Sequence, residues 1–292
     1  MSLHNSQQGL RAAHLTLGYD KRIVARDLSF TVPQGEFTAI IGPNGCGKST
    51  VLRALSRTLR PASGSLTLDG QPFDAYRPKA LARRLALLPQ DPVAPDTLTV
   101  RDLVARGRHP YHSLLRQWMP GDSEIVDQAL AATGVAELAS QFVSQLSGGQ
   151  RQRVWLAMVL CQNTEYVLLD EPTSFLDIAH QIELLHLCQD MQRSGRTVVA
   201  VLHDLNQAAR YATRLVVMNE GAIVAEGTPE QILTAELVRE VFSLECEIVP
   251  DSQSGSPMVV PLARTVARTE ERAVGRASAS ADHGAARHPV RS

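Results

Sequence analysis

The segment Gly42-Pro43-Asn44-Gly45-Cys46-Gly47-Lys48-Ser49 decides the fold, because it follows the pattern Gly-x4-Gly-Lys-Ser/Thr. It comes directly after an apolar stretch, Phe37 to Ile41, that indicates a buried strand, and directly before a helical pattern over 49–60. Glycines let the backbone wrap closely around phosphate groups, and the N-terminus of the helix adds the positive end of its dipole. The placement between strand and helix therefore predicts a phosphate-binding loop, not an ordinary glycine-rich turn.

Two side chains at the end of this loop carry the expected chemistry. Lys48 would reach the β and γ phosphates of a nucleoside triphosphate, and the Ser49 hydroxyl would bind Mg²⁺. Cys46 is either a reactive thiol or a spacer, and the spacer interpretation is favoured.

An acidic pair, Asp170 and Glu171, ends the apolar stretch Tyr166 to Leu169. Ligands of open α/β sheets bind at the carboxyl ends of the strands, and phosphoryl transfer needs an acidic residue for the metal and a group that orients or deprotonates water. Such a pair alone could be a solvated strand end, but the phosphate loop upstream favours a site. We expect Asp170 to hold the metal ion and Glu171 to orient or deprotonate the attacking water.

The surrounding pattern indicates strands and helices in alternation. A run of nearly all-apolar strands is typical of a parallel sheet that helices cover on both faces. The prediction is a doubly wound α/β core, preceded by antiparallel strands and interrupted by a helical insertion. The expected strands lie in 10–41 and at 65–68, 85–88, 166–169 and 197–202, the helical insertion at 91–162, and further helices at 178–193 and 204–211.

Composition excludes several classes of protein. The 29 basic and 30 acidic residues give a net charge of -1, so no basic field attracts nucleic acid. The four cysteines form no Cys-x2-Cys pair, which argues against a zinc site or a disulfide framework. The N-terminus has no secretory signal pattern, and the longest apolar run, Val154 to Cys161, is far below the ~20 residues of a membrane-spanning helix. If the protein acts at a membrane, another chain must supply the membrane-spanning helices.

The sequence after Pro261 is rich in Ala, Arg and Ser, and 263–292 is predicted to be disordered because it can bury little apolar surface. Arg264, Arg268, Arg272 and Arg276 have the spacing of one helix face that could contact anionic lipid. A solvated tail is the favoured interpretation.

The third segment, Leu146-Ser147-Gly148-Gly149-Gln150, precedes a clear helical pattern, and Ser147 suits the N-cap of that helix. Together with the phosphate loop and Val167 to Pro172, it makes residues 10–261 resemble the ATP-binding cassette (ABC) family. The resemblance implies an α/β fold, with a P-loop NTPase (RecA-like) core, an N-terminal antiparallel β subdomain and an inserted helical subdomain at about 91–162. It places the ATPase domain at 10–250 and a C-terminal hairpin at 251–262.

The resemblance also implies roles for single residues. Tyr19 would stack on adenine, Gln90 would approach the metal, and His203 would contact the γ-phosphate. The implied catalytic residues are Glu171, His203 and Lys48, and the implied metal ligands are Ser49, Gln90 and Asp170. The implied ATP-binding residues are Tyr19, Gly42, Pro43, Asn44, Gly45, Cys46, Gly47, Lys48, Ser49, Thr50 and Gln90. Ser147, Gly148, Gly149, Gln150 and Asp177 would act on ATP held by a second copy of the chain.

The family further implies ATP and Mg²⁺ as cofactors and a homodimer of cassettes that closes on ATP. Its partners would be two membrane permease subunits and, through them, a periplasmic or extracellular substrate-binding protein, with no nucleic acid. The chain would be a peripheral protein at the cytoplasmic face of the inner membrane.

Within the family, Arg106 to Tyr111, Leu176 to Gln181 and Leu202 to Tyr211 resemble importers of ferric siderophores, with haem and cobalamin importers as open alternatives. The chain also lacks the length for the regulatory domain of sugar importers. A soluble ABC protein of translation or DNA repair is a different class, which the single cassette and the absence of heptads argue against. Glu171 and His203 argue against a regulator that binds ATP without hydrolysis.

Overall fold

The computed structural model describes residues 8–20, 22–113 and 118–263. The chain divides into two compact units, Met1–Pro261 and Leu262–Ser292. Of the predicted disordered tail 263–292, residues 264–292 lie outside the described residues, and these include the four spaced arginines Arg264, Arg268, Arg272 and Arg276. Within the described part of the chain, no helix combines the length and apolarity that crossing a bilayer requires.

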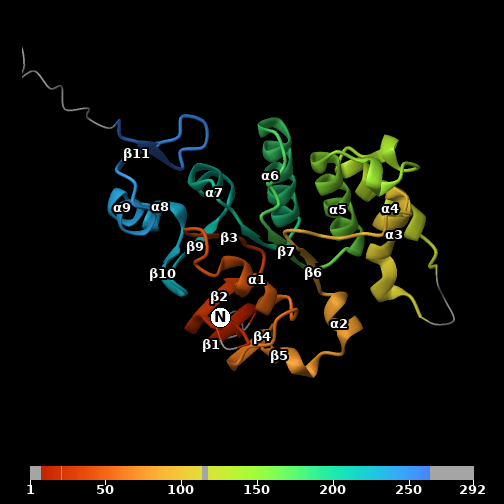
Figure 1. Cartoon of the computed structure of the whole chain (residues 1–292), viewed down its shortest axis with the longest axis horizontal. Helices are drawn as coiled ribbons and strands as arrows, with labels where there is room; N and C mark the ends of the chain where they lie inside the picture. Colours follow the sequence, from red (N-terminus) through yellow and green to blue (C-terminus); the bar gives the residue numbers. More distant parts are fainter. Residues whose placement is uncertain (1–7, 21, 114–117, 264–292) are drawn as a thin grey trace, which may run out of the picture. The chain divides into compact units, whose positions relative to one another are not determined.

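A six-stranded sheet forms the centre of the first unit, in the order β10-β9-β3-β8-β7-β6 (Figure 1). All neighbours pair in parallel except β10, which runs antiparallel to β9. Every residue of β3, β7 and β8 is buried, which explains their apolar sequences and confirms the predicted α/β core. The strands are β3 Phe37–Ile41, β6 Leu85–Leu88, β7 Tyr166–Asp170, β8 Thr197–Val201, β9 Arg214–Asn219 and β10 Ala222–Gly227.

The two faces of this sheet pack against different layers, because successive residues of a strand point to opposite sides. Ala39 belongs to a core with α5 (Gly148–Gln162), α6 (Ile178–Arg193) and α7 (Leu205–Tyr211), whereas Ile40 belongs to a core with α1 (Lys48–Leu55) and the N-terminal strands. The helix expected at 49–60 is shorter. α1 is Lys48–Leu55, and a turn follows in which Arg57 has the left-handed φ of 61°.

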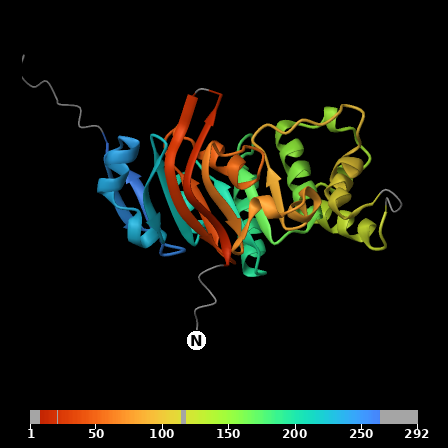
Figure 2. The same cartoon turned by 90° about the horizontal axis from the view of Figure 1, so that it is seen from below.

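The N-terminal layer is an antiparallel sheet of order β2-β1-β4-β5, in which β1 and β2 are long (Figure 2). Asp69 and Gly70, with φ of 49° and 77°, make the tight turn between its last two strands. The Asp69 carboxylate accepts hydrogen bonds from Arg84 and from the Tyr166 hydroxyl, both at 2.6 Å, and so ties this layer to the central sheet. The strands are β1 Gly9–Tyr19, β2 Arg22–Pro33, β4 Ser63–Leu68 and β5 Gln71–Pro72.

The segment expected to be a helical insertion contains several helices, and its last helix, α5, lies beside the others (Figure 1). Two short helical segments that we did not predict, η2 Phe73–Ala75 and α2 Pro78–Ala82, connect β5 to β6. The insertion contains α3 Val100–Ala105, η3 Arg106–Tyr111, α4 Asp122–Ala132, η4 Ala136–Leu138, η5 Val143–Gln145 and α5.

The C-terminal part of the first unit follows β10 and consists of α8 Pro229–Ile232, α9 Ala235–Phe242, β11 Cys246–Pro250 and β12 Pro257–Pro261. β11 and β12 pair from Cys246↔Pro261 to Pro250↔Pro257. The hairpin that we expected at 251–262 therefore begins at Cys246, and 251–256 forms its turn. We did not predict the first strand because prolines stand at the inner ends of both strands, and a proline in a sequence usually indicates the end of a strand. The limits 10–250 of the ATPase domain stay a prediction.

The segment Arg106 to Tyr111 is held by a buried charge cluster. The Arg108 guanidinium is 7% exposed, and it donates to the Asp122 carboxylate at 2.8 Å and to the Cys161 carbonyl at 3.0 Å. Burial alone would raise the pKa of Asp122, but the Met119 N–H and Arg108 hold that pKa below its usual value. A Cβ on Gly107 would lie 2.4 Å from the Met158 carbonyl oxygen, so this position requires glycine.

Arg108→Ala should lower the free energy of unfolding by about 3 kcal/mol, because it removes the guanidinium that offsets the charge of the buried Asp122 carboxylate and leaves His112 as its neighbour. Thermal denaturation should show a melting temperature lower by about 6–12 °C. The double variant Arg108→Met/Asp122→Leu removes both charges and should recover most of the loss. A melting temperature of Arg108→Ala within about 2 °C of wild type would refute this account of the segment.

Candidate nucleotide-binding site

The predicted phosphate loop joins β3 to α1, and its backbone requires glycine. Gly42 has φ 152°, and a Cβ there would lie 2.1 Å from the Met218 carbonyl oxygen. Gly45 and Gly47 have φ of 79° and 106°, in the left-handed region that other residues enter at a cost. The glycines that we expected to shape a phosphate cradle are therefore the residues that this loop conformation demands.

Lys48 is a buried cation at the base of the loop, 4% exposed. Its ammonium donates to the Gly42 carbonyl at 2.8 Å and to the Pro43 carbonyl at 2.9 Å. Both acceptors are neutral, so the charge of a buried ammonium is only partly compensated. An anionic group in the loop would complete the compensation.

Asp170 is a buried carboxylate, 1% exposed, at the end of β7. Ser49 Oγ donates to its Oδ1 at 2.8 Å. Burial raises the pKa of Asp170, the Ser49 hydrogen bond opposes that rise, and the neighbouring Glu171 charge adds to it. A hydroxyl and a carboxylate are hard oxygen donors, and Mg²⁺ takes few protein ligands besides water and substrate phosphates, so this pair fits that ion.

Glu171 lies at the meeting point of three strand ends. Its Oε2 accepts a hydrogen bond from Gln90 Nε2 at 2.9 Å, and its Oε1 lies 2.8 Å from His203 Nε2. Because an ionised carboxylate only accepts, the imidazole N–H is the donor in this pair. The φ of Glu171 is 51°, a strained value for this residue type of the kind that gathers at functional sites. The structure thus joins three residues that we predicted from separate segments.

Tyr19 and Cys46 are two further residues of the predicted ATP-binding set. The Tyr19 ring is 41% exposed at the end of β1, and its hydroxyl accepts a hydrogen bond from Arg53 Nη1 at 3.1 Å. Cys46 is 5% exposed, and burial raises the pKa of its thiol. Reactive cysteines are accessible and have lowered pKa values, so the structure favours Cys46 as a spacer. Arg53 belongs to no motif that we recognised, so its contact with Tyr19 was missed.

The segment Ser147–Gln150 begins α5 with a capping box. The Ser147 side chain accepts from Gln150 N, and the Gln150 side chain accepts from Ser147 N, at 3.3 and 3.0 Å. A Cβ on Gly148 would lie 3.7 Å from Phe175 Cβ, and one on Gly149 3.4 Å from Leu176 Cδ2. Packing within the chain therefore does not require glycine at either position.

Asp177, the last residue of the set predicted to act on a second copy, caps α6 by accepting from His180 N at 3.0 Å. Among the hydrogen bonds of residues 8–20, 22–113 and 118–263, none joins Ser147–Gln150 or Asp177 to the phosphate loop. One copy of the chain thus presents two separate parts of the predicted site. The roles assigned to these residues stay predictions.

A phosphate loop with a hydroxyl–carboxylate pair and a carboxylate–imidazole pair, at one edge of a parallel sheet, defines a nucleotide-binding protein of the P-loop class. The family model described as ABC transporter matches residues 25–174. The chain belongs to the ABC transporter family, and it is an ABC-type ATPase. The resemblance inferred from the sequence is confirmed.

Relatives with assigned functions match over most of their length. The chain is 54% identical to the ferric enterobactin transport ATP-binding protein of Escherichia coli, over 89% of this chain and 96% of the relative. It is 48% identical to a petrobactin import ATP-binding protein of Bacillus anthracis, over 87% and 94%. It is 42% identical to a hemin import ATP-binding protein of Nocardia farcinica, over 82% and 83%.

Solved structures share the fold. A metal-chelate type ABC transporter in an inward-facing conformation matches with a TM-score of 0.75 and 29% identity, over 89% of this chain and 99% of that chain. A dimeric bacterial ABC transporter cassette matches with a TM-score of 0.68 and 25% identity, over 75% and 98%. These likenesses confirm the predicted cassette fold.

Asp170→Asn should raise the stability of the nucleotide-free protein, because it removes a buried negative charge while Ser49 can still donate to the amide oxygen. The expected gain is about 1 kcal/mol, or roughly 2–4 °C in melting temperature near neutral pH. The same variant should lose Mg²⁺-dependent ATP hydrolysis.

The gain in stability from Asp170→Asn should increase as pH rises. Since the folded-state pKa of Asp170 is raised, wild type loses stability as pH rises from the unfolded-state value through the folded-state value. The advantage of the amide is therefore full above the folded-state pKa and vanishes as pH falls to about 4. Melting curves measured across this range, with Asp170→Asn below wild type at every pH, would disprove the interpretation.

Proposed function

We propose that the chain is the ATP-hydrolysing subunit of an importer for ferric siderophores, and that two copies work with two permease subunits at the cytoplasmic face of the inner membrane. The observation that carries the hydrolytic role is the Gln90–Glu171–His203 cluster, 2.9 and 2.8 Å between its polar atoms, beside the buried Asp170. A nucleotide-binding regulator without hydrolysis would not need this second carboxylate.

The proposed reaction assigns each step to a residue of the chain. The phosphate loop and Lys48 hold the β and γ phosphates and offset their charge. Glu171 orients a water molecule and accepts its proton while the oxygen forms a bond to the γ-phosphorus. The bond to the bridging oxygen breaks, and its electrons remain on ADP. His203 would donate a hydrogen bond to the γ-phosphate during this transfer.

Mg²⁺ would be held by Ser49 and Asp170, with Gln90 in reach of its water shell. When bound, the ion neutralises charge on the β and γ phosphates. The raised pKa of Asp170 supports this assignment, because a cation relieves the cost of a buried carboxylate.

Gly148 and Gly149 support a composite site between two copies. Neither Gly148 nor Gly149 has a positive φ, and neither is in a position where a Cβ would strike backbone of its own chain. A close approach from outside the chain accounts for two consecutive residues without side chains at the N-terminus of α5, where N–H groups attract anions. The likeness to a dimeric cassette is consistent with this arrangement.

The cargo assignment rests on the relatives. The chain is most similar, among those reported above, to proteins named for ferric enterobactin and petrobactin, and is less similar to one named for hemin. Haem therefore stays as the alternative cargo, and cobalamin stays an alternative from the sequence pattern alone. A soluble ABC protein outside transport is disfavoured, because these relatives are named for transport or import.

Gly149→Ala should leave folding intact and abolish most hydrolysis. Alanine is favoured over glycine within a helix, so the melting temperature should stay the same or rise slightly. ATP hydrolysis by the purified chain should fall by about 10²-fold, the effect typical of one lost oxyanion-type contact. Gly107→Ala is the matched control, because its Cβ would strike the Met158 carbonyl and lower stability instead. Full hydrolysis by Gly149→Ala would argue against the composite site.

The cargo and the chemistry can be tested together in a strain that lacks this gene. The wild-type gene should restore uptake of a radiolabelled ferric siderophore, and Glu171→Gln should not, since loss of a general base costs about 10²- to 10⁴-fold. ATP binding by Glu171→Gln should persist. Unimpaired siderophore uptake in the deletion strain, with lost uptake of haem or cobalamin, would move the cargo to that alternative. Restoration by Glu171→Gln would reject the assigned role of Glu171.

A further inference from the structure

The C-terminal lobe, residues 228–261, has a small core of its own that is completed by α7. Val238, Leu233, Cys246 and Val259 of the lobe pack together with Ala209 of that helix. α7 begins at Leu205, two residues after His203, and has only seven residues. Helices this short are not stable in isolation, so contacts on its two sides determine its orientation.

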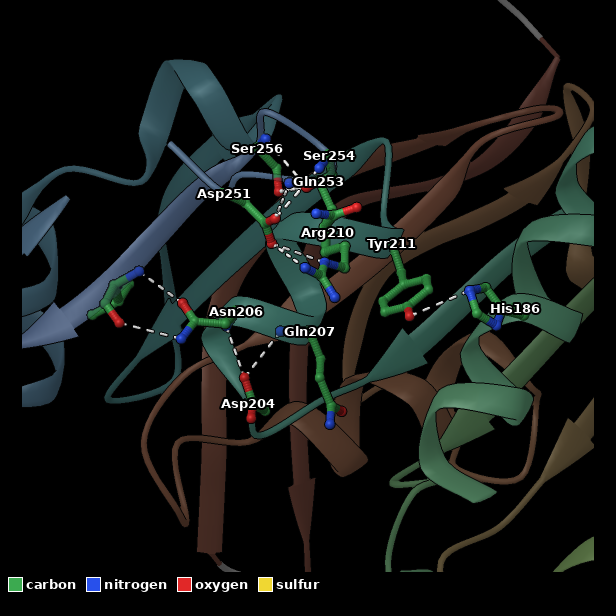
Figure 3. Close-up of polar contacts among 11 residues, drawn as sticks. His186, Asp204, Asn206, Gln207, Arg210, Tyr211, Asp251, Gln253, Ser254 and Ser256 are labelled. Atoms are coloured by element: carbon green, nitrogen blue, oxygen red, sulfur yellow. Dashed lines mark hydrogen bonds and ion pairs between the residues drawn. The ribbon is translucent and has the colours of Figure 1, made fainter. Parts of the chain in front are cut away.

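On one side, polar contacts fasten α7 to the hairpin (Figure 3). Asn206 Oδ1 accepts from Val259 N at 2.7 Å, and Asn206 Nδ2 donates to Val259 O at 3.2 Å. The amide thus pairs with β12 as a neighbouring strand would. One turn later, Arg210 Nε donates to Asp251 at 2.9 Å, and Asp251 in turn accepts from Gln253 N in the hairpin turn.

On the other side, α7 is joined to α6 and to the segment before it. Gln207 Nε2 donates to Gln181 Oε1 at 2.9 Å. Gln181 Nε2 donates to the carbonyls of Leu176 at 3.1 Å and Thr173 at 3.3 Å. Residues 173–177 directly follow the segment that carries Glu171, and Ser174 N donates to the Glu171 carbonyl at 3.1 Å.

We propose that the C-terminal lobe acts as a positioning element for ATP hydrolysis, with Gln207 and Gln181 as the positioning residues that connect it to the segment 173–177. The lobe fixes α7 through Asn206 and Arg210. α7 in turn fixes His203, two residues before its first residue, and, through Gln207, the Gln181 side chain that binds the carbonyls of 173 and 176. This inference rests on the proposed roles of Glu171 and His203.

The direction of each hydrogen bond makes the inference testable. Gln181 uses its N–H groups for two carbonyls, so only its oxygen faces Gln207, and the partner must be a donor. Gln207→Glu has nearly the same shape but offers acceptors alone. Gln207→Lys keeps a donor on an unbranched side chain.

In the purified full-length chain, Gln207→Glu should lower kcat for ATP hydrolysis by about tenfold, which corresponds to roughly 1.4 kcal/mol. KM for ATP should stay within about twofold, because Gln207 touches neither Tyr19 nor the phosphate loop. Gln207→Lys should recover most of the rate. Melting temperatures should remain near wild type, since all these groups are partly exposed.

The contribution of the lobe is measured by a double-mutant cycle. Asn206→Ala and Gln207→Glu should each reduce kcat, and the double variant should lose less than the product of the single losses, because both act through α7. Arg239→Ala is the matched control: its partner Glu245 lies in the same lobe, and it should not change kcat.

Wild-type kcat for Gln207→Glu would overturn the proposal, as would a strictly multiplicative effect in the cycle. If Asn206→Ala fails to fold, the comparison of Gln207→Glu with Gln207→Lys decides the question alone, since equal loss in both variants would also overturn it. An inactive wild type would instead count against the proposed hydrolytic function.

Discussion

The site depends on the carboxylate of Asp170, which is withdrawn from water at the edge of a sheet whose central strands are buried on both faces. Parallel pairing of these strands brings their carboxyl ends to one edge, so residues far apart in sequence converge there. A buried negative charge beside Glu171 is costly unless a cation or donors offset it. Ser49 supplies one donor, which compensates only part of the Asp170 charge. This edge of the sheet is therefore suited to a metal ion bound together with phosphate.

Some glycines of this chain are required by packing within the chain itself, and others are not. At Gly42 and Gly107, a Cβ would meet backbone atoms of the same chain within 2.1 and 2.4 Å, so the fold itself explains the residue. At Gly148 and Gly149, the chain leaves room for a side chain. The first pair would be needed by any folded copy, whereas packing within the chain does not explain the second pair. A sequence motif alone does not separate these cases.

Much of the fold could be predicted because its central strands are nearly all apolar and its motifs lie at strand ends, as Asp170 ends β7 and Glu171 follows it. The end of α1 could not be predicted, because Arg57 in a left-handed conformation has no signature in sequence. The start of the hairpin at Cys246 was missed, since its pairing partner lies beyond a turn flanked by prolines. The link from Gln207 to Gln181 joins two recognised segments, but only the packing of α7 beside α6 brings them together.

The four cysteines of the chain are all free and buried. Burial raises the pKa of each thiol, to about 11 for Cys161 and about 12 for Cys188, and the same direction holds for Cys46 and Cys246. Oxidants react with accessible thiolate, which such thiols supply in only trace amounts at physiological pH. Cys46 lies within the phosphate loop, and its burial makes this thiol a poor target for oxidants.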